Sequence, residues 1–232
     1  MRYSLSAVTV TAIVPVPARF ALRREALLAP VAGLSPLVRV VKALAATCDV
    51  VVAAAEPIIA SVRESLAEEG VSSLQVVLAD PPGERAQCVA AGLRDVAGGS
   101  PVVVHDVEWP LVGAGTVERI VASLQAGAVA VMPARPVTDS IKAVDAAGVV
   151  RATLDRAPLR TVQYPRGFDS GVLAQLVAHG ASGAFDELEV ALSTGTPVTL
   201  IDGDDDALSV ELPRDAAYLA ALIEGRHDVA GR

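Results

Sequence analysis

The feature that most constrains this fold is a regular alternation of short apolar runs with longer segments of helical periodicity. The apolar runs are rich in β-branched residues and predict buried strands at residues 8–14, 50–52, 74–78, 101–105 and 128–132. Helical spacing predicts helices at residues 36–44, 57–69, 84–97 and 115–125. Ser35 stands where a helix N-cap belongs, and Gly70 where a closing glycine belongs. The pattern predicts an α/β fold with a Rossmann-like, mostly parallel sheet and helices on both faces.

The rhythm changes after about residue 135. Residues 142–144 and 149–151 flank a turn that contains Gly148, which predicts a β-hairpin arm projecting from the sheet domain. Later elements are expected as helices at 168–179, 185–194 and 213–224 and a strand at 197–201. We therefore expect one domain over residues 1–232, with residues 137–162 as a β-arm.

Composition excludes several classes of protein. A net charge of −8 and a pI near 4.9 argue against a nucleic-acid partner. No apolar run reaches the roughly 18 residues of a membrane span, and residues 8–14 resemble a strand rather than a secretion signal. Two cysteines, Cys48 and Cys88, fit a reducing cytoplasm and suggest no metal site. Of 19 basic residues, only Lys42 and Lys142 are lysines.

Ligands of such sheets bind beyond the carboxyl ends of the strands, where four loops should meet. These loops are residues 15–20, 80–85, 105–110 and 136–142. Asp106 at the end of the fourth strand is the leading candidate for a site residue, although it could simply cap a turn. Arg85 could equally pair with Glu84 or Asp80. Cys88 could be a small buried apolar residue rather than a reactive thiol.

Several motifs, in order along the chain, resemble one known family. Residues 83–93 (GERAQCVAAGL) are similar to its Arg-x-x-Ser-Val-x-x-Gly-Leu helix, and residues 104–112 (VHDVEWPLV) to its His-Asp-Ala-Ala-Arg-Pro strand end. Residues 136–142 (PVTDSIK) resemble Pro-Val-x-Asp-Thr-Ile-Lys. Residues 153–168 resemble Thr-x-Asp-Arg followed by Gln-Thr-Pro-Gln-x-Phe. The family is that of 2-C-methyl-D-erythritol 4-phosphate cytidylyltransferase, of non-mevalonate isoprenoid synthesis, and the resemblance covers nearly the whole chain.

The resemblance implies a fold of the nucleotide-diphospho-sugar transferase type that dimerises through the β-arm. It implies that CTP and methylerythritol phosphate react to CDP-methylerythritol and pyrophosphate, with Mg²⁺ accompanying the nucleotide. Asp106 and Arg19 are then the catalytic candidates, and no side chains are assigned as a metal site. The nucleotide-binding positions implied are Pro15, Val16, Pro17, Gly83, Arg85 and Cys88. The substrate-binding positions implied are Asp106, Ser140 and Arg156, the last two partly across the dimer.

The chain departs from the family pattern in the loop that should hold the triphosphate. Ala18 and Phe20 replace glycines, while Ala26 and Ser209 stand at the two lysine positions. Other replacements are Leu22 and Trp109 for arginines and Phe185 for a threonine. Losing one preorganised donor at a developing charge typically costs about 10²–10³ in rate. The cations that could compensate are Arg19, Arg23 and Arg24. Two hypotheses follow: a diverged nucleotidyltransferase, of CTP or a changed nucleotide, or a non-catalytic paralogue with a binding or regulatory role.

Overall fold

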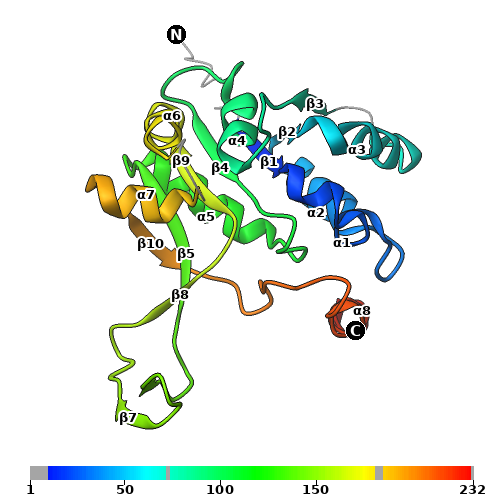
Figure 1. The fold of residues 1–232 in the computed structure, drawn as a ribbon. Coiled ribbons are helices and arrows are strands. Elements are labelled where there is room, and N and C mark those ends of the chain that lie inside the picture. Colours follow the sequence, from blue (N-terminus) through cyan, green and yellow to red (C-terminus); the bar gives the residue numbers. More distant parts are fainter. Residues whose placement is uncertain (1–9, 72–73, 181–184, 231–232) are drawn as a thin grey trace.

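An eight-stranded, mostly parallel sheet forms the centre of the computed structural model, which describes residues 10–71, 74–180 and 185–230 (Figure 1). The strands are β1 Thr11–Val16, β2 Asp49–Ala54, β3 Gln75–Leu78, β4 Pro101–Val104, β5 Ala130–Pro136, β6 Lys142–Val144, β7 Val150–Thr153, β8 Arg160–Val162, β9 Arg166–Asp169 and β10 Thr199–Asp202. The helices are the 3₁₀ helix η1 Ala18–Ala21 and α1 Arg24–Leu28, α2 Pro36–Ala45, α3 Glu56–Glu68, α4 Arg85–Leu93, α5 Ala114–Gln125, α6 Ser170–His179, α7 Glu187–Thr194 and α8 Ala216–Ala230.

The strand order of the sheet creates one switch point. The order is β10-β5-β9-β4-β1-β2-β3, with β8 added at the end of β5. From β1 the chain moves outward to β2 and β3, and then returns to place β4 on the other side of β1. Ligands of open α/β sheets bind where the order reverses, beyond the carboxyl ends of the strands. The carboxyl ends of β1 and β4 therefore mark where a site should form.

Helices cover both faces of the sheet, as the sequence predicts. One core cluster joins the sheet to α2, α3 and α5, and a second joins it to α4, α6 and α7. Ser35 caps α2, because its side chain accepts a hydrogen bond from the Val38 amide. Gly70 follows α3 in the left-handed conformation at φ +68°. Both predicted helix boundaries are confirmed.

The first strand extends further along the chain than predicted, to Val16, and residues 8 and 9 of the predicted strand lie outside the described residues. Pro15 and Val16 pair with Ala53 and Ala54 of β2 and are buried strand residues, not loop residues. Successive residues of β1 direct their backbone N–H and C=O groups alternately to β4 and to β2. The Ile13 carbonyl accepts from the His105 amide, next to β4, and the Val16 carbonyl accepts from the Ala55 amide, next to β2. The nitrogen of Pro15 therefore faces the side on which β4 has already ended, so its missing N–H breaks no ladder bond.

A strand that sequence periodicity did not indicate lies at the centre of the sheet. Residues 166–169 form β9, which is antiparallel to both β4 and β5. The helix expected from residue 168 begins at Ser170 instead, and Asp169 caps it by accepting from the Gly171 and Val172 amides. Other differences are smaller: η1 begins within the loop expected at residues 15–20, α1 is a helix that was not predicted, and α4 ends at Leu93.

The β-arm projects from the body at the lower left of Figure 1. Strands β6 and β7 form a separate two-stranded sheet, as the hairpin pattern predicts. Asp145 closes the turn by accepting from the Ala147 and Val149 amides, and Gly148 takes φ +78°. Helix α8 packs away from the sheet on residues near Ala26 and Leu111. Within the described ranges, no helix is both long and apolar enough to cross a bilayer.

Candidate active site

Charged side chains gather at the switch point, where three loops follow β1, β3 and β4. Arg85 opens α4 and is buried, with its side chain bonded on three sides. Its Nη1 donates to Asp106 Oδ2 at 2.7 Å, its Nε to Glu187 Oε1 at 2.8 Å, and its Nη2 to the Tyr164 hydroxyl at 3.0 Å. Burial opposes the charge more than any single neighbour favours it, but Glu187, Tyr164 and Asp106 together outweigh burial and raise the pKa of Arg85. Arg85 pairs across the fold, not with Glu84 or Asp80.

Arg166 closes this cluster from β9. Its Nη1 donates to Glu187 Oε2 at 2.9 Å and to both oxygens of Asp186. Its guanidinium also stacks over the Tyr164 ring, 4.2 Å from the centroid. Glu187 is fully buried, and its carboxylate lies between the guanidinium groups of Arg85 and Arg166. These two positive charges compensate the cost of burying the negative charge of Glu187.

Asp106 performs two tasks at the end of β4. Its Oδ1 accepts from the Glu108 amide at 3.0 Å, while Oδ2 accepts from Arg85. The carboxylate therefore caps the turn, as the simpler interpretation holds, and also joins the buried charge cluster. Both of its oxygens are engaged by other groups of this chain.

His105 and Trp109, which flank Asp106 in the sequence, pack against Tyr164 beside the charged cluster. The Trp109 ring lies 5.9 Å from that of Tyr164, and the Trp109 carbonyl contacts His105 Nε2 at 2.8 Å. Burial lowers the pKa of His105 to about 4, so the imidazole is neutral at neutral pH and serves as a structural group. Trp109, at a position where the family pattern has an arginine, packs against Tyr164.

The candidate cations of the β1 loop meet a carboxylate. Arg19 Nη2 lies 3.3 Å from Glu108 Oε2, and Arg23 Nη1 lies 3.7 Å from Glu108 Oε1. Arg24 points elsewhere and donates to Ser61 Oγ and the Pro57 carbonyl on α3. Of the three cations proposed from sequence, the structure thus brings Arg19 and Arg23 together and separates Arg24.

Backbone amides of the loop after β1 already have hydrogen-bond partners within the protein. The Ala18 amide donates to the Gly83 carbonyl at 2.9 Å, and the Phe20 amide donates to the Pro17 carbonyl. Gly83 takes φ +76°, and a Cβ added there would lie 2.6 Å from the Cβ of Ala55. Cys88 is fully buried, and burial raises the pKa of its thiol to about 12. Pro15, Val16, Pro17, Gly83 and Cys88 therefore act here as packed wall residues, with no side chain presented to an open space.

Of the three positions expected to bind the acceptor, Asp106 lies in this cluster, whereas Ser140 and Arg156 lie on the arm, away from it. Ser140 is exposed, and the Arg156 guanidinium donates to the Thr138 carbonyl within the arm. Lys142 donates to Thr153 Oγ1 across the hairpin. Within this one chain, Ser140 and Arg156 do not join the charged residues of the switch point.

The described residues of the switch point do not build a magnesium site by themselves. Mg²⁺ prefers oxygen ligands, mainly carboxylates and phosphates. Asp106 has Arg85 at 2.7 Å, so the place of a cation beside this carboxylate is taken by a guanidinium. In the part of the chain that the structure describes, no three His, Cys, Asp or Glu side chains form a group that could hold a metal ion.

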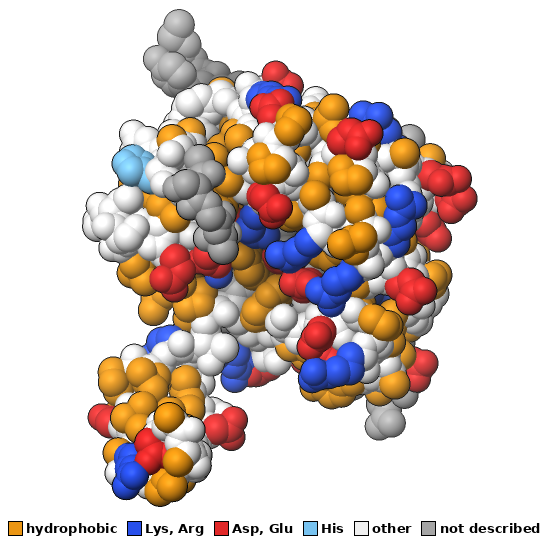
Figure 2. All heavy atoms as spheres, in the orientation of Figure 1, with side chains coloured by type: hydrophobic (Ala, Val, Ile, Leu, Met, Phe, Trp, Pro, Cys, Tyr) orange, Lys and Arg blue, Asp and Glu red, His pale blue; other side chains and the backbone are white. Residues whose placement is uncertain are grey.

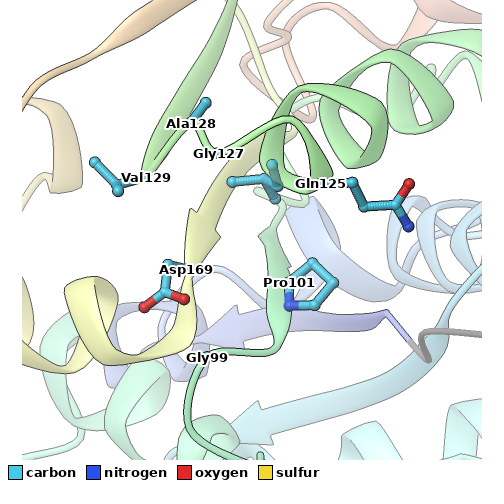
Figure 3. A pocket seen from close by; sticks show the side chains of 8 residues that line it. Gly99, Pro101, Gln125, Gly127, Ala128, Val129 and Asp169 are labelled. Atoms are coloured by element: carbon cyan, nitrogen blue, oxygen red, sulfur yellow. The ribbon is translucent and has the colours of Figure 1, made fainter.

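Two cavities help to locate a ligand. One of about 450 Å³ lies beside the β1 loop, lined by Ala21–Ala26 and Pro213. Another of about 400 Å³ lies at the opposite edge of the sheet, between Pro101 and Val129 (Figure 3). Its one charged lining residue, Asp169, already caps α6. The first cavity alone adjoins the cations of the switch point.

Sequence reasoning missed four members of this site. Glu108, Tyr164 and Arg166 lie inside the family-like motifs but are not predicted as site residues, and Glu187 lies outside those motifs. Glu108 could have been found from its place two residues after Asp106 in a carboxyl-end loop. The role of Glu187 depends on pairing with Arg85, 102 positions earlier, which no local signal reveals.

Comparisons with known proteins decide the family. The model of the 2-C-methyl-D-erythritol 4-phosphate cytidylyltransferase family, IspD, matches residues 10–225. The chain belongs to the IspD family. A relative of that name from Saccharopolyspora erythraea is 36% identical over 205 residues, covering 84% of this chain and 89% of the relative.

Two other curated relatives are covered less completely. A relative from Nocardia farcinica is 39% identical over 143 residues, 62% of each chain. The bifunctional IspD/IspF enzyme of Paracoccus denitrificans is 37% identical, and the match spans 51% of its length. Among solved structures, the cytidylyltransferase from Thermus thermophilus aligns with a TM-score of 0.70 at 24% identity, covering 92% of this chain and 98% of that one. These structures share the IspD fold described above.

Proposed function

We propose that this chain is a diverged IspD nucleotidyltransferase that binds CTP at the switch point and transfers the cytidylyl group slowly. In this reaction an oxygen of methylerythritol phosphate bonds to the α-phosphorus of CTP, and the bond to pyrophosphate breaks. The observation that carries the proposal is the pair Arg19 and Arg23, two cations held together beside the loop of Asp106. They would neutralise charge on the leaving pyrophosphate.

The expected rate is low for a stated reason. Ala26 and Ser209 supply no cation at the two lysine positions of the family pattern. Arginine binds phosphate through a planar fork and does not place its charge as a lysine does. With about 10²–10³ lost per missing donor, and without assuming additivity, we expect turnover at least about a hundredfold below that of a chain with both lysines. Mg²⁺ would arrive with the triphosphate, whose oxygens are its usual ligands.

A second candidate is a non-catalytic paralogue that retains only binding. One observation favours it: the crevice is neutralised from within. Each arginine of the crevice already has a carboxylate partner. Arg19 and Arg23 pair with Glu108. Arg85 pairs with Asp106 and Glu187, and Arg166 pairs with Asp186 and Glu187. The Ala18 amide is likewise already bonded to Gly83.

One assay separates the two candidates. The purified chain is incubated with CTP, Mg²⁺ and methylerythritol phosphate, and pyrophosphate is measured. We expect slow release that Asp106→Asn abolishes and that Asp95→Asn, an exposed control, leaves unchanged. No release and no CTP-induced rise in melting temperature would refute the proposal. A rise in melting temperature without release would favour the paralogue.

We also propose that two copies associate through the β-arm and that the protein is cytoplasmic. The arm exposes large apolar side chains, Val144, Val149, Val150, Leu154 and Leu159. In Figure 2 the arm at the lower left carries many hydrophobic side chains among a few charged ones. Apolar patches of this kind are typical of protein interfaces. Sedimentation equilibrium should report a dimer that Val150→Asp converts to a monomer, and a monomer in the unsubstituted chain would contradict the proposal. The two unpaired cysteines are in keeping with a reducing compartment.

A further inference from the structure

We propose that Glu108 is an internal anion that holds Arg19 and Arg23 in the position of a phosphate, and that a phosphate-bearing ligand must displace it. The inference deepens the proposed function and rests on it only in placing the ligand at this switch point. Its basis is the geometry of three side chains and their separate anchors.

The carboxylate of Glu108 bridges the two arginines. One oxygen faces Arg19 at 3.3 Å, and the other faces Arg23 at 3.7 Å. The guanidinium fork matches carboxylate and phosphate alike. A phosphate group can therefore present two oxygens to the same two cations.

Each arginine has a second anchor that does not depend on Glu108. The Arg19 guanidinium lies 5.1 Å from the ring centroid of Phe20, which is buried. Arg23 donates through Nη2 to the Leu212 carbonyl at 3.2 Å. Departure of the carboxylate would therefore leave both cations in place, so the site is preorganised for another anion.

Glu108 itself is fixed at its backbone and loosely held at its side chain. Its amide donates to Asp106 Oδ1, and its carbonyl accepts from the Val210 amide at 2.8 Å. The side chain is 32% exposed, and solvent screens ion pairs of this exposure, so they hold the carboxylate only weakly. Burial and the nearby Asp106 charge raise the pKa of Glu108, which means that this position disfavours the ionised carboxylate relative to water. The carboxylate can swing into solvent while the loop stays in place.

Space for the ligand adjoins Arg23. The cavity of about 450 Å³ is lined by residues 21–26, which include Arg23, Arg24 and the carboxylate of Glu25, and by Pro213. A ligand larger than one phosphate group could extend into it. Figure 2 shows positive and negative side chains intermingled across the middle of the face that it draws.

The test measures binding of inorganic pyrophosphate by titration calorimetry, with no nucleotide and no turnover. Glu108→Gln should bind at least about tenfold more tightly than the unsubstituted chain, since the competing charge is gone. Glu69→Gln, which removes an exposed carboxylate paired with Lys42 at 3.0 Å, should leave the affinity unchanged. Adding Arg19→Ala to Glu108→Gln should abolish the gain.

Each other outcome is decisive. Equal or weaker binding by Glu108→Gln and by a second variant, Glu108→Ala, would overturn the inference, as would no measurable binding by any of these proteins. Circular dichroism confirms that each variant is folded before titration. If the gain appears while CTP yields no pyrophosphate, the inference stands and the proposed function fails. If CTP is turned over and the gain is absent, the proposed function stands and the inference fails.

Discussion

Arg85 donates to Asp106 at 2.7 Å, so the two residues that carry the family motifs of α4 and of the β4 loop neutralise each other. The pair is buried, and Arg85 continues to Glu187, which has no exposed surface. The charges of Arg85, Asp106 and Glu187 therefore pair with one another inside the protein. Any ligand that recruits Asp106 must compete with a guanidinium already in contact with it.

Removal of Arg85 should strongly destabilise the protein. Breaking a buried ion pair on one side typically costs about 3–5 kcal/mol, because a charge remains without its partner. Glu187 keeps Arg166, so we expect Arg85→Met to lower the unfolding free energy by about 3 kcal/mol in a urea titration. Arg94→Met, whose partner Asp80 is exposed, should change it by less than about 1 kcal/mol. Similar losses for the two variants would show that the buried cluster contributes no special stability.

The Tyr164 hydroxyl should contribute separately. It accepts from Arg85 Nη2 at 3.0 Å and contacts Glu187 Oε2 at 3.3 Å, so Tyr164→Phe leaves a buried donor unsatisfied. An unsatisfied buried polar group costs about 1–3 kcal/mol. We expect a loss in that range by urea unfolding, and no loss for Tyr218→Phe on the exposed face of α8. A Tyr164→Phe protein as stable as its parent would mean that water or Glu187 replaces the hydroxyl.

How much of the fold follows from sequence depends on the kind of signal. Apolar runs and caps are local, so β2, β4 and the Ser35 cap were predicted close to their positions. Strand β9 was not, because Arg-Gly-Phe-Asp has neither an apolar run nor strict alternation. Its arginine is buried only because Asp186 and Glu187 compensate it, and its glycine is required only because Ile120 packs against it.

The candidate site divides in the same way. The carboxyl-end rule located Asp106, Arg85 and Arg19, and these side chains do gather at the switch point. Sequence could not reveal that Glu108 pairs with Arg19 and Arg23, since ion pairs between loops depend on the fold as a whole. It also could not reveal that the Ala18 amide is bonded to Gly83.

The buried imidazole of His105 should make stability depend on pH. Burial lowers its pKa to about 4 in the folded protein, against about 6.5 unfolded, so between these values the unfolded chain binds more protons. The stability it contributes is present above pH 6.5 and is lost as the pH falls towards 4, by about 3 kcal/mol at most.

This loss is measured as the difference between the parent and His105→Gln in urea titrations at several pH values. Glutamine can still donate to the Trp109 carbonyl but does not titrate, so the variant should lack the His105 contribution to the slope. His179→Gln, an exposed control, should keep it. Equal slopes for the parent and His105→Gln would show that the pKa of His105 is the same in the folded and the unfolded chain.

The close approach of β9 to α5 predicts a specific steric cost at Gly167. A Cβ added there would clash with Ile120 Cγ2 and lie 3.3 Å from Leu124 Cδ1. Overpacking of a filled core typically costs about 1–3 kcal/mol, which we expect for Gly167→Ala in urea unfolding. Gly98→Ala, where an added Cβ meets open space, is the matched control. Ile120→Ala should be destabilising alone yet should offset part of the Gly167→Ala loss, because the methyl group then enters the space vacated. Strict additivity of the two losses would place the strain of Gly167→Ala elsewhere than against Ile120.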